Sequence, residues 1–354
     1  MKHILFISLT LALTVFLAVG CKEKTKEKTQ ITPNEAASVK TAADTKKIRV
    51  TFDTDANNEL DDQHALAYLL FNGDVFEVVG VTVNATRGGG DVDSQYAEAF
   101  RVMQLCTLDG KIPLLKGANG IFSDIDPGND SFDGADAVNF MIENSTKNQD
   151  DKTILLAVGK LTNVALALKK APEMIPNVKV VWLGSNYPEP GEYNQENDTT
   201  ALNYLLKTDV EFEMVTVRYG TPSGTAAVSV TQSEINETMP GKGPQALSPV
   251  EGRHGESFST FGDYSINLFE HIDYHGDPPS RALFDMAAVA IVKNQAWAEK
   301  RKIPCPTLLS DGTWVEKPDN TRTITVWENF ARDEIMTDFY DRLNNYVLAG
   351  KDAN

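Results

Sequence analysis

Residues 53–62 read DTDANNELDD and directly follow IRVTF, a largely β-branched run at 48–52. The run predicts a β-strand, and the apolar spacing of residues 60–71 predicts an amphipathic helix immediately after it. In an open α/β sheet, ligands bind where the carboxyl ends of the strands meet the following helices. The stretch therefore predicts an α/β fold with an acidic site at this strand–helix junction.

The alternation of strand and helix continues outward from this junction. The predicted strands span 48–52, 75–83, 112–115, 153–158, 178–183, 212–217 and 323–327, and the predicted helices span 60–71, 92–108, 135–142, 161–169, 198–206, 283–292 and 334–347. Strands that are apolar on both faces are typical of a parallel sheet covered on both sides. We therefore predict one α/β domain over residues 48–350, a three-layer, Rossmann-like, mostly parallel sheet with helices on both faces. Residues 223–280, rich in Gly, Ser and Pro, interrupt the pattern as an irregular insertion or lid.

The composition of the chain indicates which classes of molecule it is expected to bind. The chain of 354 residues is 42% hydrophobic and 23% charged, with 50 acidic against 33 basic residues and a formal net charge of -17. Such a surface repels phosphate backbones, so nucleic acid is not an expected partner. Divalent cations and neutral polar molecules fit this charge better.

The first 47 residues carry the features of an export signal and a tether. The apolar stretch from Ile4 to Val19 is short for a membrane span and ends at Cys21, where the sequence resembles a lipobox. We predict a lipoprotein signal peptide over residues 1–21, lipidation of Cys21 and a flexible tether over 22–47. The implied location is the cell envelope, as a periplasmic or outer-membrane lipoprotein that meets the membrane only through its lipid. An uncleaved signal anchor and an ordinary cleaved signal are the alternatives.

The four aspartates of residues 53–62 have three interpretations. Aspartates are common at the solvated start of a helix. An EF-hand loop also begins D-x-D-x-N, but Asn58 stands where its turn requires glycine and His64 where it requires glutamate. The third interpretation is a metal site completed by distant residues, because crowded carboxylates are stabilised by a cation and oxygen ligands favour Ca²⁺ or Mg²⁺.

Several motifs resemble one known family in the same order. The acidic stretch is similar to the DxDPGxDD signature of the inosine–uridine-preferring nucleoside hydrolases, although its loop is longer. VGKLTN at 158–163 resembles TGPLTN, WLG at 182–184 resembles MGG, EYNQEND at 192–198 resembles E-F-N-x-x-x-D, and LFD at 283–285 resembles L-H-D. The resemblance covers roughly residues 48–295.

The resemblance implies Ca²⁺-dependent hydrolysis of the N-glycosidic bond of ribonucleosides to ribose and free base. The Ca²⁺ ligands that it implies are Asp55, Asp62, Asp285 and the backbone carbonyl of Val158. Asp55 is also the implied catalytic base, which accepts a proton from the attacking water.

The resemblance also implies a set of substrate contacts. Those to the ribose hydroxyls are Asp61, Asn186, Glu192 and Asn194. Asn84 falls near a family asparagine, and either binds substrate or caps its strand. Two other aspartates have supporting roles: Asp53 in the turn, and Asp198 as a helix cap.

Phe284 departs from the family pattern, in which a histidine stands near the leaving base. Phenylalanine cannot donate a proton, so either it stacks on the base or another residue is the acid. The candidate histidines are His64, His254, His271 and His275. Two other functions therefore stay open: a non-catalytic Ca²⁺-dependent nucleoside- or sugar-binding lipoprotein, and a hydrolase of a related non-nucleoside glycoside. The preferred base, a homo-oligomer and a disulfide between Cys106 and Cys305 are also left open.

Overall fold

The computed structural model describes residues 46–146 and 152–350. From Lys46 onward the chain forms one compact unit. The predicted signal peptide, the lipidation site Cys21 and nearly all of the predicted tether lie outside the described residues. Within the described ranges, no helix is long and apolar enough to cross a membrane.

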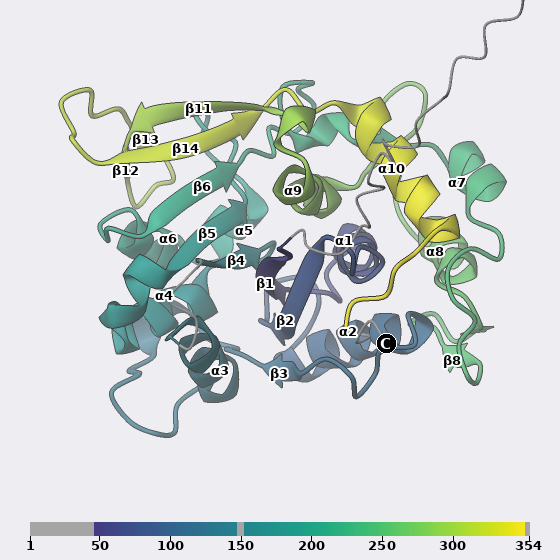
Figure 1. Cartoon of the computed structure of the whole chain (residues 1–354). Coiled ribbons are helices and arrows are strands. Elements are labelled where there is room, and N and C mark those ends of the chain that lie inside the picture. The colour runs from purple at the N-terminus through teal and green to yellow at the C-terminus, as the bar shows by residue number, and fades with distance from the viewer. Residues whose placement is uncertain (1–45, 147–151, 351–354) are drawn as a thin grey trace, which may run out of the picture. The chain divides into compact units, whose positions relative to one another are not determined.

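An eight-stranded sheet forms the centre of the fold, in the order β11-β14-β6-β5-β4-β1-β2-β3 (Figure 1). Every neighbouring pair is parallel except β11 with β14, which confirms the predicted mostly parallel sheet. The strands are β1 (Ile48–Thr54), β2 (Phe76–Val83), β3 (Leu114–Lys116), β4 (Thr153–Ala157), β5 (Val178–Leu183), β6 (Glu211–Val215), β11 (Glu299–Pro304) and β14 (Thr323–Glu328). The chain builds outward from β1 through β2 to β3, and then returns to the other side of β1 with β4. The strand order therefore reverses between β1 and β4, which is where α/β sheets of this kind bind ligands.

Helices cover both faces of the sheet and create two hydrophobic cores. They are α1 (Asp61–Leu70), α2 (Val92–Leu105), α3 (Ala135–Thr146), α4 (Thr162–Lys170), α5 (Tyr193–Asn197), α6 (Thr199–Leu205), α9 (Phe284–Lys293) and α10 (Arg332–Asn344). Alternate residues of β4 point to opposite cores: Leu156 packs with α1 and α9, whereas Leu155 packs with α4 and α6. All five residues of β4 are buried, because a strand covered on both sides has no solvent-facing positions.

Cys106 and Cys305 are both free and buried. They belong to different hydrophobic cores, Cys106 to the one containing α1 and Cys305 to the one containing α4. The structure therefore answers the open question of a disulfide: these two cysteines do not pair.

The segment 223–280 is partly helical, with α7 (Gln232–Thr238) and α8 (Phe261–Glu270). Thr231 and Thr260 cap these helices by accepting hydrogen bonds from backbone N–H groups in the first turn. Phe261 and Phe269 of α8 pack edge-on against His64 of α1. The segment thereby covers the helix that carries two of the predicted site aspartates.

The sequence reading missed β11. Its residues, EKRKIP, are mostly charged and exposed, because an edge strand faces solvent and its exposed side chains carry charge. Without an apolar alternation, the stretch gave no strand signal.

Candidate active site

The site lies where the strand order reverses. Asp55 follows β1, and Val158 follows the neighbouring β4, whose end is held to β1 by a hydrogen bond of 2.9 Å from the Val158 N–H to the Asp53 carbonyl. Leu183 and Val217 lie at the ends of the next two strands. These residues line a cavity of about 300 Å³, within the size range of small-molecule sites.

Three buried aspartates meet at one end of this cavity. Carboxylate oxygens of Asp61, Asp62 and Asp285 all lie within 4.8 Å of one another. Asp61 and Asp62 begin α1, and Asp285 lies in the first turn of α9, which packs against α1. Helix N-termini carry partial positive charge, which favours carboxylates at both positions. Asp55 lines the same cavity and accepts a hydrogen bond of 2.6 Å from the Thr86 hydroxyl.

The electrostatics of this cluster fit a bound cation. Burial, with further contributions from neighbouring carboxylates, raises the pKa of Asp55 and of Asp61 to about 7. The same causes raise the pKa of Asp62 and of Asp285 well above the usual range. Within residues 46–146 and 152–350, none of these four carboxylates forms an ion pair with Lys or Arg. Ionising them together therefore requires a positive charge, and a donor set made only of oxygen suits a hard divalent cation such as Ca²⁺ or Mg²⁺.

A buried polar layer supports the acidic loop from beneath. Asp53 accepts hydrogen bonds from the Thr82 hydroxyl at 2.6 Å and from the amides of Asn163 and Asn84 at 2.8 and 3.0 Å. Asp53 thus supports the turn, as predicted. Asp198 accepts a hydrogen bond from the Ala201 N–H and caps α6, also as predicted.

Two predicted substrate contacts are not among the residues that line this cavity, and their role stays a prediction. Asn84 does not line the cavity, because its side-chain amide turns back to donate to Asp53. Asn186 does not line it either: its amide donates to the Gly191 carbonyl and its oxygen accepts from the Tyr219 N–H at 3.2 Å. Asn84 is held by Asp53 of β1 and Asn186 by neighbouring loops, contacts that the family resemblance does not reveal.

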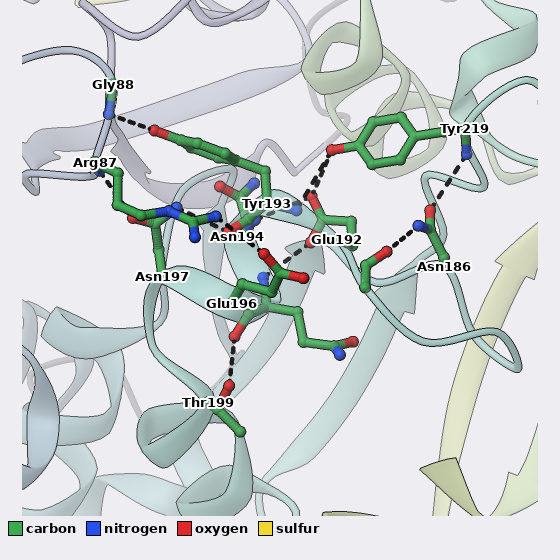
Figure 2. Close-up of polar contacts among 12 residues, drawn as sticks. Arg87, Gly88, Asn186, Glu192, Tyr193, Asn194, Glu196, Asn197, Thr199 and Tyr219 are labelled. Atoms are coloured by element: carbon green, nitrogen blue, oxygen red, sulfur yellow. Dashed lines mark hydrogen bonds and ion pairs between the residues drawn. The ribbon is translucent and has the colours of Figure 1, made fainter. Parts of the chain in front are cut away.

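Glu192 and Asn194 line the cavity, and Figure 2 shows their polar contacts. The Glu192 carboxylate accepts backbone N–H bonds from Ser185, Asn194 and Gln195 at 2.8–3.0 Å, and so caps α5. The Asn194 amide donates to the carbonyl of Val158 at 2.6 Å and to that of Leu183 at 3.2 Å. A carbonyl oxygen has two lone pairs, so the predicted role of Val158 as a cation ligand is compatible with this hydrogen bond.

Several cavity residues were not predicted, among them Tyr219 and Arg281, and His275 was predicted only as one of four candidate histidines. Tyr219 packs edge-on against Phe284, with ring centroids 5.7 Å apart and planes at 88°. Its hydroxyl lies 3.5 Å from the Glu192 carboxylate, and Figure 2 marks this contact by a dashed line. Tyr219 follows the strand β6 at the same sheet edge as Asp55, and this position was the available signal.

The four candidate histidines have very different surroundings. His64 is buried in α1 and bonds to the Leu60 carbonyl at 2.6 Å and the Ser265 hydroxyl at 2.7 Å. His254 and His271 stack on each other, with ring centroids 4.1 Å apart. Of the histidines in the described residues, only His275 lines the cavity.

Comparison with known proteins identifies the family. The sequence profile of the inosine-uridine preferring nucleoside hydrolases matches residues 50–342, which is most of the chain and includes all the motifs that resemble this family. The chain belongs to this nucleoside hydrolase family. Among individual relatives, an uncharacterised protein of Schizosaccharomyces pombe is 27% identical over 193 residues, a match that spans 48% of this chain and 60% of the yeast protein.

Solved structures of nucleoside hydrolases share the fold. A plant nucleoside hydrolase superposes with a TM-score of 0.65 at 15% identity, covering 84% of this chain and 99% of its own. The inosine-uridine preferring nucleoside hydrolase of Bacillus anthracis gives 0.59 at 18% identity, covering 85% and 100%. A purine-preferring ribonucleoside hydrolase from Gardnerella vaginalis gives 0.60 at 17% identity, covering 83% and 98%. At such identities the likeness concerns the nucleoside hydrolase fold, and the chemistry must be argued from the site of this chain.

Proposed function

We propose that this nucleoside hydrolase family member cleaves the N-glycosidic bond of ribonucleosides, releasing ribose and free base, with Ca²⁺ as its cation. The observation that carries the proposal is the buried cluster of Asp61, Asp62 and Asp285, which lies at a cavity of about 300 Å³ at the switch point of the sheet. Asp55, Asp62, Asp285 and the Val158 carbonyl would hold the cation, with Asp61 beside them.

The reaction needs an activated water and stabilisation of positive charge on the sugar. When bound, the cation makes a water molecule easier to deprotonate. Asp55 is the base that takes the proton, because it lines the cavity beside the other proposed cation ligands and a positioned carboxylate can accept a proton from the attacking water. The negative charge of the surrounding carboxylates stabilises the oxocarbenium-like ribosyl cation as it forms.

Asp61, Glu192 and Asn194 are the proposed ribose contacts. All three line the cavity, and between them they offer carboxylate and amide oxygens that accept hydrogen bonds from sugar hydroxyls. Glu192 is held by three backbone N–H groups, so its carboxylate is already oriented before substrate binds. Fixed groups of this kind align the reacting atoms at little entropic cost.

The test is base release from a panel of nucleosides, including an activated nitrophenyl riboside, with and without a chelator. Turnover should disappear with the chelator and return with Ca²⁺. Asp55→Asn should lower turnover by roughly 10²–10⁴-fold, the usual loss for a positioned base. Asp109→Asn, a change at an exposed site, should leave turnover unchanged. If the wild type binds nucleosides but releases no base from any of them, the binding-lipoprotein function takes the place of the hydrolase.

We also propose that the chain is anchored to the cell envelope through lipid on Cys21. The support is the sequence at its N-terminus, where an apolar stretch ends at this cysteine and a polar tether follows. Cys21→Ser should abolish incorporation of labelled fatty acid and release the protein from the membrane fraction. Unchanged labelling of the variant would contradict the anchor.

A further inference from the structure

A second cavity of about 310 Å³ adjoins the acidic one. Four residues line both cavities: Tyr219, His275, Arg281 and Phe284. No acidic side chain in the described part of the chain lines the second cavity, whose remaining lining is made of small residues. An aromatic, carboxylate-free space suits a flat heterocycle, whereas the acidic cavity suits the sugar and the cation.

The four residues that line both cavities form a shared wall between them. The bond between the base and the ribose would therefore break at this shared wall. When the glycosidic bond breaks, its electron pair goes to the base, and a positioned proton donor lowers the barrier. Phe284 has no proton to give. Arg281 is ion-paired with Glu59, and a guanidinium does not release its proton in proteins.

Tyr219 is a poor donor as well. Burial and the nearby Glu192 carboxylate hold the pKa of its phenol well above the usual range, so proton release is costly. His275 is the remaining member of the wall, and imidazole is the side-chain type that most readily exchanges protons near neutral pH. Within residues 46–146 and 152–350, no hydrogen bond engages its ring nitrogens, which leaves them available to a ligand.

The backbone fixes His275 relative to the acidic end of the site. Its N–H donates to the Ser280 carbonyl at 2.9 Å, and the Ser280 N–H donates back at 2.8 Å. Ser280 leads directly into β10 (Arg281–Ala282), which pairs with β7 (Ser229–Val230) and precedes α9. The same short run of chain thus positions His275 at the base side and Asp285 at the cation side.

We propose that His275 is the general acid that protonates the departing base, an inference that rests on the proposed nucleoside hydrolysis. The C1′–N bond breaks with its electrons going to the base, and the protonated imidazole transfers its proton to a ring nitrogen of that base. The water oxygen bonds to C1′, and Asp55 takes the proton that the water loses. Before the next turnover, Asp55 returns this proton to solvent and the imidazole regains one from solvent. The substrates are nucleosides whose bases leave only when protonated, as hypoxanthine-like purines do.

The test compares two leaving groups in one variant. His275→Gln should lower kcat/KM for inosine by roughly 10²-fold or more, since it removes a positioned acid. The same variant should hydrolyse 4-nitrophenyl riboside at close to the wild-type rate, because nitrophenolate leaves without a proton. His254→Gln removes a histidine that does not line the cavity and should match the wild type on both substrates.

Two outcomes would overturn the assignment. An equal loss on both substrates would show that His275 only positions the loop, and unchanged inosine hydrolysis would show that it has no part in the reaction. Failure of the underlying function looks different, because the wild type would then hydrolyse neither substrate. His275 is exposed and outside both cores, so the variant is expected to fold, and its thermal midpoint should equal that of His254→Gln.

Discussion

Gly159, next to Val158 at the end of β4, has no room for a side chain. A Cβ there would lie 2.6 Å from the Asp55 carboxylate and 3.0 Å from the Asn84 amide. Gly159→Ala must therefore displace Asp55, and a small displacement of a reacting group can cost up to about 10²-fold in rate. We expect kcat/KM to fall by about tenfold or more in steady-state assays. Gly128→Ala is the control, because this exposed glycine meets only the flexible end of Asp126. Full activity of Gly159→Ala would mean that Asp55 tolerates displacement, against its role as base.

For individual residues, the sequence predicted a place in the site only where the residue belongs to a recognisable motif. Asp62, Asp285, Glu192 and Asn194 line the cavity as expected from their motifs. Asn84 and Asn186 were predicted as substrate contacts from the family resemblance, but which way an amide turns depends on the residues packed around it. His275 lies in a stretch without helical or strand periodicity, so nothing local to it showed that it would face the cavity.

Helix α1 shows how burial acts on a whole element. All ten of its residues are buried, and burial lowers the pKa of His64 from 6.5 to about 4. Because the folded pKa is depressed, the unfolded chain binds a proton between pH 6.5 and about 4 while the folded chain does not. Stability is therefore complete above pH 6.5 and is lost as the pH falls through this window.

The expected contribution of His64 between pH 7 and pH 5 is about 2 kcal/mol. His64→Gln removes the titration and keeps a side chain that can donate and accept hydrogen bonds. Urea unfolding at the two pH values should show a smaller loss of stability at pH 5 for the variant than for the wild type, by about this amount. Equal losses in the two proteins would show that His64 is not the group responsible.

Regular elements with an apolar pattern were the predictable part of the fold. The buried strands β4 and β5 match their predicted ranges closely, because a strand covered on both faces must be apolar throughout. The helix α8 was not predicted, since its apolar residues are mixed with Gly, Asp and Ser. Its burial comes from packing against α1, a long-range contact that a local window does not contain.

For the whole molecule, the proposed cation site couples ligand binding to stability. Its residues come from the loop after β1, from the ends of β4 and from the starts of α1 and α9, so a bound ion joins distant parts of the chain. A ligand that binds only the folded state at 100 times its Kd stabilises it by about 2.7 kcal/mol. Urea unfolding should show a difference of this order between protein in saturating Ca²⁺ and protein in chelator.

Asp285→Asn serves as the matched variant for this measurement. It should lose most of the Ca²⁺-dependent difference, whatever its stability without calcium, because it removes one proposed ligand from the cluster. An identical unfolding midpoint for the wild type with Ca²⁺ and with chelator would contradict the proposed site.

The two unpaired cysteines lie in the hydrophobic cores on opposite faces of the sheet, so each can report on the packing of its own face. Cys106 is fully enclosed in the core that contains α1, and Cys305 in the core that contains α4. A thiol reagent can modify each cysteine only when the core around that cysteine opens. The labelling rates therefore measure the local opening of each core. In a Cys21→Ser background, following both modifications by peptide mass in one time course would show which layer of the molecule separates from the sheet first.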